Sequence, residues 1–239
     1  MLMDISTPNW DKFPALQALQ GEVVNCNRCT RLREYCRQVA AEKRRAYRGC
    51  EYWGRPVPSF GDPEARILVV GLAPAAHGAN RTGRMFTGDR SGQWLYRALY
   101  DVGLANQPQS VSREDGLSLQ GVYISAAVRC APPGNKPLPE EIRNCRGYLD
   151  RELDLLPNLR VVVALGKIAF DTCLDLWKLR GVVRSRAAFA FGHNREFPIG
   201  PNLPVLVSSY HPSQQNTSTG KLTEKMLLAV FRRAKHLAW

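Results

Sequence analysis

The segment 71–89 combines small residues, arginines and an aromatic ring, a mixture that suits a ligand-binding loop. Its glycines and alanines let a ligand approach the backbone closely. Asn80, Arg81 and Arg84 could bind phosphate groups, and Phe86 could stack on a planar base. The segment has neither the dinucleotide-binding glycine pattern nor the Gly-Lys-Ser/Thr end of a phosphate-binding loop. Its residue types therefore predict ligand binding without identifying the ligand.

A single histidine, His211, stands where the apolar run 205–208 gives way to a loop rich in amides and hydroxyls. Pro212 disfavours continuation of the strand, so His211 is expected at the strand's carboxyl end. Most isolated histidines are structural, but at such a strand end a functional role is an equal alternative. The residues that follow, 214–218, could contact a partner or form a mobile surface loop.

The cysteines suggest a metal or cluster site. Cys26 and Cys29 form a Cys-x-x-Cys pair, and Cys130 and Cys145 follow about a hundred positions later. Four thiolates can bind zinc or an iron–sulfur cluster, and the spacing does not separate the two. The alternative is a set of small buried core residues, which we favour for Cys173 in its apolar helix. Two further cysteines that could compete as ligands are Cys36 and Cys50.

The charge of the chain is strongly positive, +12 over 239 residues. A pI near 9.7 favours a polyanionic partner, either nucleic acid or an anionic membrane surface. The basic stretch 28–48 is either a phosphate-facing surface or a solvated helix face. No run of about 18 apolar residues is present and residues 1–20 do not resemble a secretory signal, so we expect a cytoplasmic protein without a membrane partner. That compartment disfavours structural disulfides, which strengthens the case for ligation by cysteine.

Short apolar runs alternate with helical patterns from residue 67 onward. Because the runs are continuously apolar, we expect strands that are covered on both faces, as in a parallel sheet. The predicted strands are Ile67–Val70, Val122–Val128, Val161–Leu165 and Val205–Ser208. The predicted helices are Ser91–Gly103, capped by Ser91, and Pro139–Leu155, Lys167–Leu179 and Lys221–Leu237. The alternation predicts an α/β sandwich that binds its ligand at the carboxyl ends of the strands.

Three segments, Gly71–Gly92, Ser125–Pro137 and His211–Thr217, together resemble the uracil-DNA glycosylase superfamily. They look most like its type B branch, often called family 5. The four cysteines at positions 26, 29, 130 and 145 match the 4Fe–4S pattern of that branch. The resemblance extends from about Cys26 to Lys235, with the motifs in the same order throughout.

The resemblance implies a three-layer α/β/α sandwich with a central four-stranded parallel sheet and one catalytic pocket at its carboxyl edge. Residues 1–239 would form one glycosylase domain, with a basic, cluster-binding N-terminal segment at 1–65. The cysteines would hold a structural 4Fe–4S cluster rather than zinc. The implied enzyme is a monofunctional DNA glycosylase, which hydrolyses the N-glycosidic bond of uracil or another damaged base and leaves an abasic site. We expect a nucleoid-associated monomer that acts on a base flipped from double-stranded DNA, and also on single-stranded DNA.

The resemblance also implies roles for individual residues. His211 would donate a hydrogen bond to the base carbonyl as negative charge develops there, and its protonation state stays open. Asp89 would stabilise the sugar cation or orient the attacking water. Asn135 is a second polar candidate, or simply a turn residue. The residues expected at the base are Gly71, Ala73, Phe86 and Ala126. The residues expected to contact DNA are Asn80, Arg81, Arg84, Ser213, Gln214, Gln215 and Asn216.

Two departures from the other branches of the superfamily predict broad specificity. The segment Gly71–Ala76 offers no acidic or amide side chain, so Asp89 is the substitute for the usual water activator. Ala126 stands where other branches carry an asparagine that hydrogen-bonds the edge of uracil. A pocket without that polar group should discriminate weakly. We therefore expect hydroxymethyluracil, hypoxanthine and etheno-cytosine as further substrates.

Two other functions fit part of the sequence. A non-catalytic nucleic-acid-binding module with an iron–sulfur cluster or zinc explains the charge and the cysteines, but not the ordered motifs at the strand ends. A hydrolase of small nucleotides or nucleosides explains a pocket, but it needs no charge of +12.

Overall fold

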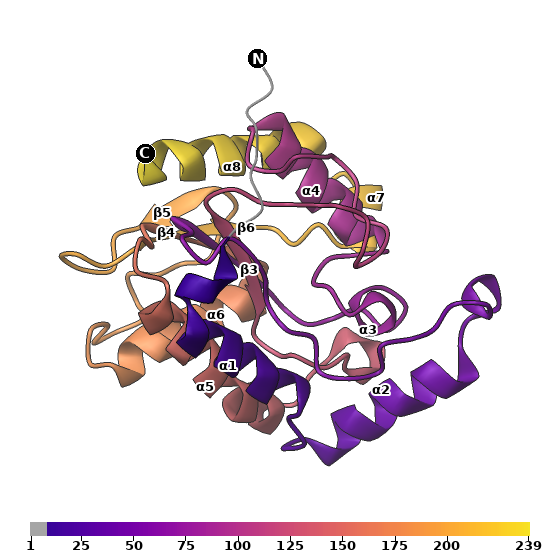
Figure 1. Cartoon of the computed structure of the whole chain (residues 1–239). Helices are drawn as coiled ribbons and strands as arrows, with labels where there is room; N and C mark the ends of the chain where they lie inside the picture. Colours follow the sequence, from indigo (N-terminus) through magenta and orange to yellow (C-terminus); the bar gives the residue numbers. More distant parts are fainter. Residues whose placement is uncertain (1–8) are drawn as a thin grey trace.

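The structure is a computed structural model that describes residues 9–239 (Figure 1). Residues 1–8, which are part of the segment predicted not to be a secretory signal, lie outside the described residues. Within 9–239, no helix has the length and apolar character that a membrane crossing requires.

A six-stranded sheet forms the centre of the fold, in the order β1-β3-β2-β4-β6-β5. Its strands are β1 (Phe60–Gly61), β2 (Ile67–Gly71), β3 (Val122–Ala126), β4 (Val161–Leu165), β5 (Arg195–Phe197) and β6 (Val205–Ser209). The four predicted strands are the inner ones, and neighbouring pairs among them are parallel. The prediction of a four-stranded sheet is wrong at both edges, where β1 and β5 add antiparallel strands. These two strands are only 2 and 3 residues long, too short to produce a recognisable hydrophobic pattern.

Helices cover both faces of this sheet, so the architecture has three layers (Figure 1). One face packs against α1 (Pro14–Val24), α2 (Thr30–Glu42), α5 (Pro139–Leu155) and α6 (Lys167–Leu179). The other face packs against α4 (Arg90–Asp101) and α8 (Glu224–Ala238). Two short helices, α3 (Ala79–Thr82) and α7 (Gln214–Ser218), lie in loops after strands. The 3-10 turns are η1 (Trp10–Lys12), η2 (Arg45–Tyr47) and η3 (Pro133–Asn135).

Alternate residues of each inner strand enter different cores. In β2, Leu68 and Val70 pack against the α1–α5–α6 side, whereas Ile67 and Val69 pack against the α4–α8 side. All five residues of β2 are buried. This two-sided burial explains why the strand sequences are continuously apolar, as the sequence predicted.

The predicted helices differ from the observed ones mainly at their first residues. The bounds of α5 and α6 are those predicted. Helix α4 begins at Arg90, and its cap is Asp89 rather than Ser91, because the Asp89 carboxylate accepts a hydrogen bond from the Gly92 N–H. Helix α8 begins at Glu224, where Thr223 caps the N–H of Met226. In both cases a side-chain oxygen that satisfies a free N–H decides where the helix begins.

A buried ion pair joins the sheet to the helices on one face. Arg129 follows β3 and pairs with Glu152 of α5, and both side chains are at most 1% exposed. Ser59 and Ser125 donate hydrogen bonds to the Glu152 carboxylate at 2.6 and 2.7 Å, and Gln20 of α1 donates at 3.1 Å. Because buried charges are costly unless paired and hydrogen-bonded, this network depends on all of its members.

Candidate active site

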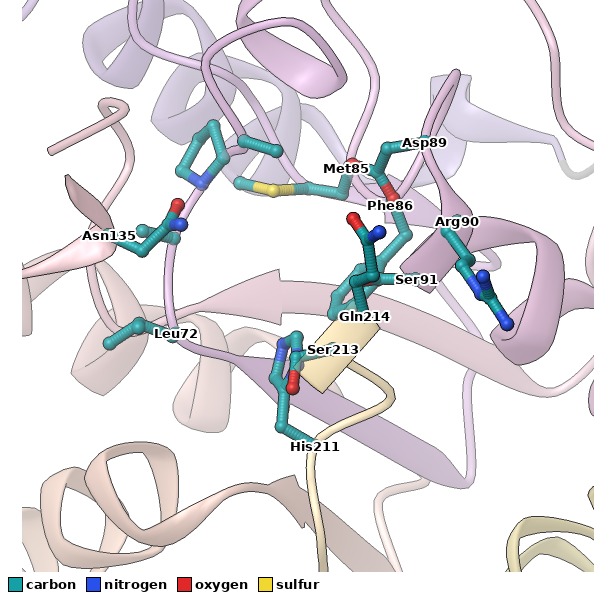
Figure 2. A pocket seen from close by; sticks show the side chains of 13 residues that line it. Leu72, Met85, Phe86, Asp89, Arg90, Ser91, Asn135, His211, Ser213 and Gln214 are labelled. Atoms are coloured by element: carbon teal, nitrogen blue, oxygen red, sulfur yellow. The ribbon is translucent and has the colours of Figure 1, made fainter. Parts of the chain in front are cut away.

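Three loops that follow three parallel strands enclose a cavity of about 400 Å³ at the carboxyl edge of the sheet. One follows β2, the second follows β3 and contains η3, and the third follows β6 and leads into α7. Figure 2 shows Asn135 on one side of the cavity and Arg90 on the other, with His211 and Phe86 between them. The lining residues are Leu72, Ala73, Pro74, Ala75, Met85, Phe86, Asp89, Arg90, Ser91, Asn135, His211, Ser213 and Gln214. All three predicted catalytic residues therefore meet in one cavity.

Asp89 has both a structural and an electrostatic role at the cavity wall. Its Oδ1 accepts a hydrogen bond from the Gly92 N–H at 2.9 Å, which caps α4. Burial raises the pKa of this carboxyl, although the N–H groups of Gly92 and Ser91 and the nearby Arg81 charge oppose the rise. Gly78 makes room for the carboxylate, because a Cβ there would lie 2.1 Å from Asp89 Oδ2. The fold thus holds a partly desolvated carboxylate beside the ligand space.

His211 lines the same cavity from the loop after β6, and its side chain is half-buried. Its ring stacks on Phe86, with centroids 5.9 Å apart and an interplanar angle of 28°. Its backbone carbonyl accepts a hydrogen bond from the Asn216 side chain at 2.9 Å, which ties the loop to α7. Burial lowers the pKa of the imidazole to about 4. A pKa this low keeps the ring neutral near pH 7.

The pKa of His211 predicts the acid limit of the site. Because neutral imidazole is the form at pH 7, activity that needs this form should be steady from about pH 6 to 8 and should fall below about pH 5. The same shift in pKa affects stability. Below the ordinary pKa of histidine, His211 binds a proton in the unfolded chain but not in the folded chain. Folding stability should therefore decrease as the pH falls from about 6.5 toward 4.

Single-turnover rates across this pH range check the assignment, with the His211→Gln variant as the comparison. If the variant keeps the acid limb of the wild type, the limb belongs to Asp89, whose carboxylate must be ionised. A wild-type rate that rises steadily as the pH falls from 7 to 5 would instead identify imidazolium as the active form.

Phe86 has an unusual backbone conformation, with φ of +53° in a residue that is not glycine. Such a conformation is strained and tends to occur at functional sites. The Tyr96 hydroxyl holds the preceding turn by donating to the Met85 carbonyl at 2.7 Å. Gly71, the last residue of β2, lies beneath the ring and does not line the cavity, because a Cβ there would lie 2.7 Å from Phe86 Cζ. Gly71 is thus predicted to act on a base only through the position of Phe86.

Replacing Gly71 with alanine tests that role. The added methyl group should push the Phe86 ring off His211 and lower kcat/KM about 10- to 100-fold, since small displacements of positioning groups are costly. A matched control is Gly147→Ala in α5, where a Cβ would meet no atom within 4 Å. Equal kcat/KM for both variants would show that the close packing under Phe86 has no functional consequence.

Of the other residues predicted to bind the base or to act in catalysis, some line the cavity and some do not. Ala73 lines the cavity, but Ala126 is buried at the end of β3, paired with Gly71, and does not line it. Asn135 ends η3 with φ of +57° and lines the cavity from the loop after β3. It is therefore both a turn residue and a cavity residue. A turn accounts for the positive φ of Asn135, but it does not account for the position of the side chain across the cavity from Arg90.

Two residues predicted to bind DNA are buried in structural contacts, so for them the prediction is wrong. Asn80 is 0% exposed, and its amide donates to the carbonyls of Cys36 and Ala76. Arg84 is 4% exposed and pairs with Asp115 at 2.7 Å. The sequence offered no sign of the contacts with Cys36 and Asp115, because these two partners come from distant parts of the chain.

The other predicted DNA-contact residues lie on or near the surface. Ser213 caps α7 and lines the cavity together with Gln214. Gln215 is exposed, whereas Asn216 is held by its bond to the His211 carbonyl. Arg81 is half-buried, and it donates to the carbonyls of His77 and Gly88.

Several residues of the cavity wall were not predicted from the sequence. Arg90 and Ser91 follow Asp89 in the first turn of α4, so their place at the cavity follows from the cap. Recognising Asp89 as the N-cap would have identified both. Met85 and Leu72 are apolar residues whose spacing carries no functional signal.

The predicted cluster ligands come from three places, and the fold brings them near one another. Cys29 caps α2, Cys130 follows β3, and Cys145 lies in α5. Burial raises the pKa of Cys145 to about 12, and the Cys130 and Cys26 thiols add to the rise. Burial likewise raises the pKa of Cys29, and the same two neighbours contribute. Yet within residues 9–239 no three His, Cys, Asp or Glu side chains are grouped closely enough to hold a metal ion.

Comparisons with known proteins agree with this geometry. Residues 58–235 match the family described as the Uracil DNA glycosylase superfamily. A type-5 uracil-DNA glycosylase of Thermus thermophilus is 53% identical over 222 residues, which are 93% of this chain and 98% of that protein. A type-5 uracil-DNA glycosylase of Pyrobaculum aerophilum is 50% identical over 214 residues, 90% of this chain and 89% of that protein. A type-4 uracil-DNA glycosylase of Archaeoglobus fulgidus is 33% identical over 159 residues, 66% of this chain and 70% of that protein.

These matches cover the loops that form the cavity as well as the sheet that carries them, and they confirm the resemblance of the three motifs. The chain therefore belongs to the uracil DNA glycosylase superfamily and is a glycosylase, a hydrolytic enzyme of that superfamily.

Proposed function

We propose that this protein is a type-5 uracil-DNA glycosylase, which hydrolyses the bond between a damaged base and deoxyribose in DNA and leaves an abasic site. One observation carries the proposal. A largely buried carboxylate and an aromatic ring from the loop after β2, together with a neutral histidine from the loop after β6, line a single cavity of about 400 Å³. Relatives at 53% and 50% identity bear the type-5 name.

The chemistry divides between the two ends of the bond that breaks. A water oxygen bonds to C1′ of the sugar while the bond from C1′ to the base nitrogen breaks, and the bonding electrons leave with the base. His211, neutral near pH 7, donates a hydrogen bond to the base carbonyl on which negative charge develops. A neutral donor suits this step, because it stabilises the departing anion without first losing a proton to it.

Asp89 acts at the sugar. Its negative charge stabilises the positive charge that grows on C1′, and it orients the water and accepts the proton that the water loses. Burial raises the pKa of this carboxyl, which makes the carboxylate a better proton acceptor than an exposed aspartate. Asn135 is positioned on the cavity wall to hold the water or the substrate.

The cavity walls support the broad specificity that we propose. Around the ligand space they are mainly apolar, with Leu72, Pro74 and Met85 beside Ala73 and Ala75. Rejection of a wrong base requires a polar group that the wrong base leaves unpaired. Ala126, at the position where the resemblance places such a group in other branches, has no polar side chain and is buried. Uracil, hydroxymethyluracil, hypoxanthine and etheno-cytosine are the proposed substrates.

The deciding experiment uses duplexes that carry one uracil opposite guanine, followed by alkaline cleavage of abasic sites. The proposal requires strand cleavage with the wild type, at least 100-fold less with His211→Ala, and cleavage of a hypoxanthine duplex as well. Strict uracil preference would overturn the broad specificity but leave the glycosylase intact. Base release from free deoxyuridine but not from duplex DNA would instead identify a nucleoside hydrolase.

We also propose that Cys26, Cys29, Cys130 and Cys145 hold a structural 4Fe–4S cluster. The donor set consists of thiols alone, which suits such a cluster. The backbone N–H of Arg129 donates to Cys145 Sγ at 3.3 Å, and the Asn144 amide donates to Cys29 Sγ at 3.6 Å. Hydrogen bonds of this kind stabilise thiolate ligands. The cluster would join α2 to α5 and take no part in the reaction.

Cys36 is the residue that complicates this ligand set. It donates a hydrogen bond to the Ala131 carbonyl and interacts with Cys130, which raises the pKa of Cys130. Iron and acid-labile sulfide analysis of the purified protein tests the assignment. A brown protein with four iron atoms, lost in Cys145→Ser but kept in Cys36→Ala, supports it. A colourless protein with stoichiometric zinc refutes it.

A further inference from the structure

A second cavity, of about 550 Å³, borders the same loop as the active site. Arg81 and Thr82 of α3 line it, whereas Phe86 and Asp89 of the same loop line the active site. Its other walls come from residues 50–55 and 112–114. The proposed reaction uses none of these residues, so the cavity needs its own explanation.

An immobilised tryptophan forms one wall. The Trp53 indole donates a hydrogen bond to the Pro56 carbonyl at 3.1 Å. Gly83 supports the ring from below, because a Cβ there would lie 2.8 Å from Trp53 Cδ2. The ring remains half-exposed toward the cavity. A fixed aromatic surface of this kind is what a nucleic-acid base stacks on.

The guanidinium groups of two exposed arginines lie over the ring, where an incoming base would displace them toward its phosphate. Arg113 Cζ lies 4.9 Å and Arg55 Cζ lies 5.9 Å from the ring centroid. Within residues 9–239, neither arginine forms an ion pair. Both guanidinium groups are therefore available to an anionic ligand beside an aromatic surface.

Arg84 holds one of these arginines in place. Its buried ion pair with Asp115 anchors the loop 110–115, and its Nη1 donates to the Arg113 carbonyl at 3.3 Å. Arg84 is thus a positioning residue for Arg113, whereas the sequence predicted a direct phosphate contact. Together with Gly83 under Trp53, it explains why the loop carries a Gly-Arg pair at positions that do not touch the active-site cavity.

Arg81 connects this cavity to the catalytic loop and to the basic N-terminal stretch. Its guanidinium lies 4.1 Å from the Tyr47 ring centroid and donates to the Gly88 carbonyl, one residue before Asp89. Tyr47 belongs to η2, which also contains the exposed Arg45. The exposed Arg44 and Arg48 flank this turn. Positively charged side chains therefore extend from the loop of the active site, past this cavity, to the exposed arginines around η2.

The charge of the cavity favours one class of ligand. Arg55, Arg81, Arg113, Glu51 and Glu114 line it, which gives a formal net charge of one positive unit. A phosphodiester carries one negative charge, whereas a free nucleoside phosphate carries more. The balance suits a nucleotide within a chain.

We propose that this cavity binds one nucleotide of the DNA outside the flipped base, with its base stacked on Trp53 and its phosphate between Arg55 and Arg113. The proposal rests on DNA being the substrate. Residues 50–55 and 112–114 would then bind the DNA next to the lesion.

The test measures binding to oligonucleotides that hold a tetrahydrofuran spacer in place of the damaged base, so no bond is cleaved. A second spacer then replaces each flanking nucleotide in turn. At one flanking position the spacer should weaken wild-type binding about tenfold, and it should have no further effect on Trp53→Leu, because the variant has already lost that stack. Additive losses at every position would overturn the proposal.

Arg113→Gln provides a second variant that leaves the core intact, since Arg113 is exposed. It should weaken binding and reduce the slope of log K against log salt by about one. Arg232→Gln, an exposed arginine of α8 that lines neither cavity, is the charge-matched control and should leave the slope unchanged. Equal slopes for the two variants would count against the cavity.

The outcome is separable from that of the proposed function, because binding is measured on DNA without a scissile base and base release is measured separately. If free deoxynucleoside monophosphate competes with the oligonucleotide only when Trp53 is present, while the spacer has no effect that depends on its position, the cavity is a site for free nucleotides. That result would overturn the assignment to the DNA chain.

Discussion

Replacing Asp89 with asparagine is expected to slow single-turnover base release at least 100-fold while leaving the melting temperature nearly unchanged. The rate falls because an amide neither stabilises the sugar cation nor accepts a proton from water. The fold survives because asparagine and aspartate are equally good helix caps, so the amide oxygen can still accept the Gly92 N–H. This pair of results separates the two roles of Asp89.

Asp89→Ala removes both roles and provides the comparison. It should lose about 1 kcal/mol of stability with the cap, in addition to the loss of activity. Thr223→Ala is the matched control, because Thr223 caps α8 in the same way but does not line the cavity. It should lower stability by a similar amount and keep the wild-type rate. A wild-type rate in Asp89→Asn would mean that Asp89 is only a cap and that the sugar is stabilised by another group.

The second large effect is on folding. Glu152→Gln should destabilise the protein by about 3–5 kcal/mol, because it leaves the charge of Arg129 buried without a counter-ion. For a chain of this size that corresponds to a melting temperature lower by roughly 6–20 °C. The bonds from Ser59 and Ser125 to Glu152 would weaken as well. Thermal unfolding followed by circular dichroism measures the shift.

Two further variants make this prediction specific. Asp101→Asn removes one partner of the exposed Arg97–Asp101 pair and should change stability by only about 0.5 kcal/mol. The double variant Arg129→Met/Glu152→Leu removes both buried charges and should be more stable than Glu152→Gln. If the double variant were the less stable of the two, the loss would arise from packing rather than from an unpaired charge.

The same ion pair links the sheet to the proposed cluster. The Arg129 N–H donates to Cys145 Sγ, and Cys130 is the next residue. A chain that loses the ion pair should therefore also lose iron more readily, which iron analysis of Glu152→Gln can measure.

The sequence determined the parts of this protein that depend on local pattern. The inner strands are buried on both faces, so their apolar runs were recognisable, and α5 and α6 begin and end at the predicted residues. His211 was recognised because it follows a strand, whereas Asp89 and Asn135 were proposed from the resemblance of their motifs. All three line one cavity because the carboxyl ends of parallel strands meet at one edge of a sheet.

Which polar residues face the ligand and which face the protein depends on long-range contacts in the folded chain. Arg84 and Asn80 have the same residue types as phosphate-binding groups, but Asp115 and the Cys36 carbonyl, both distant in the chain, bury them. The neutrality of His211 likewise follows from its burial against residues of other loops. Spacing along the chain carries no record of such neighbours, because the cost of burying a charge is set by what surrounds it in space.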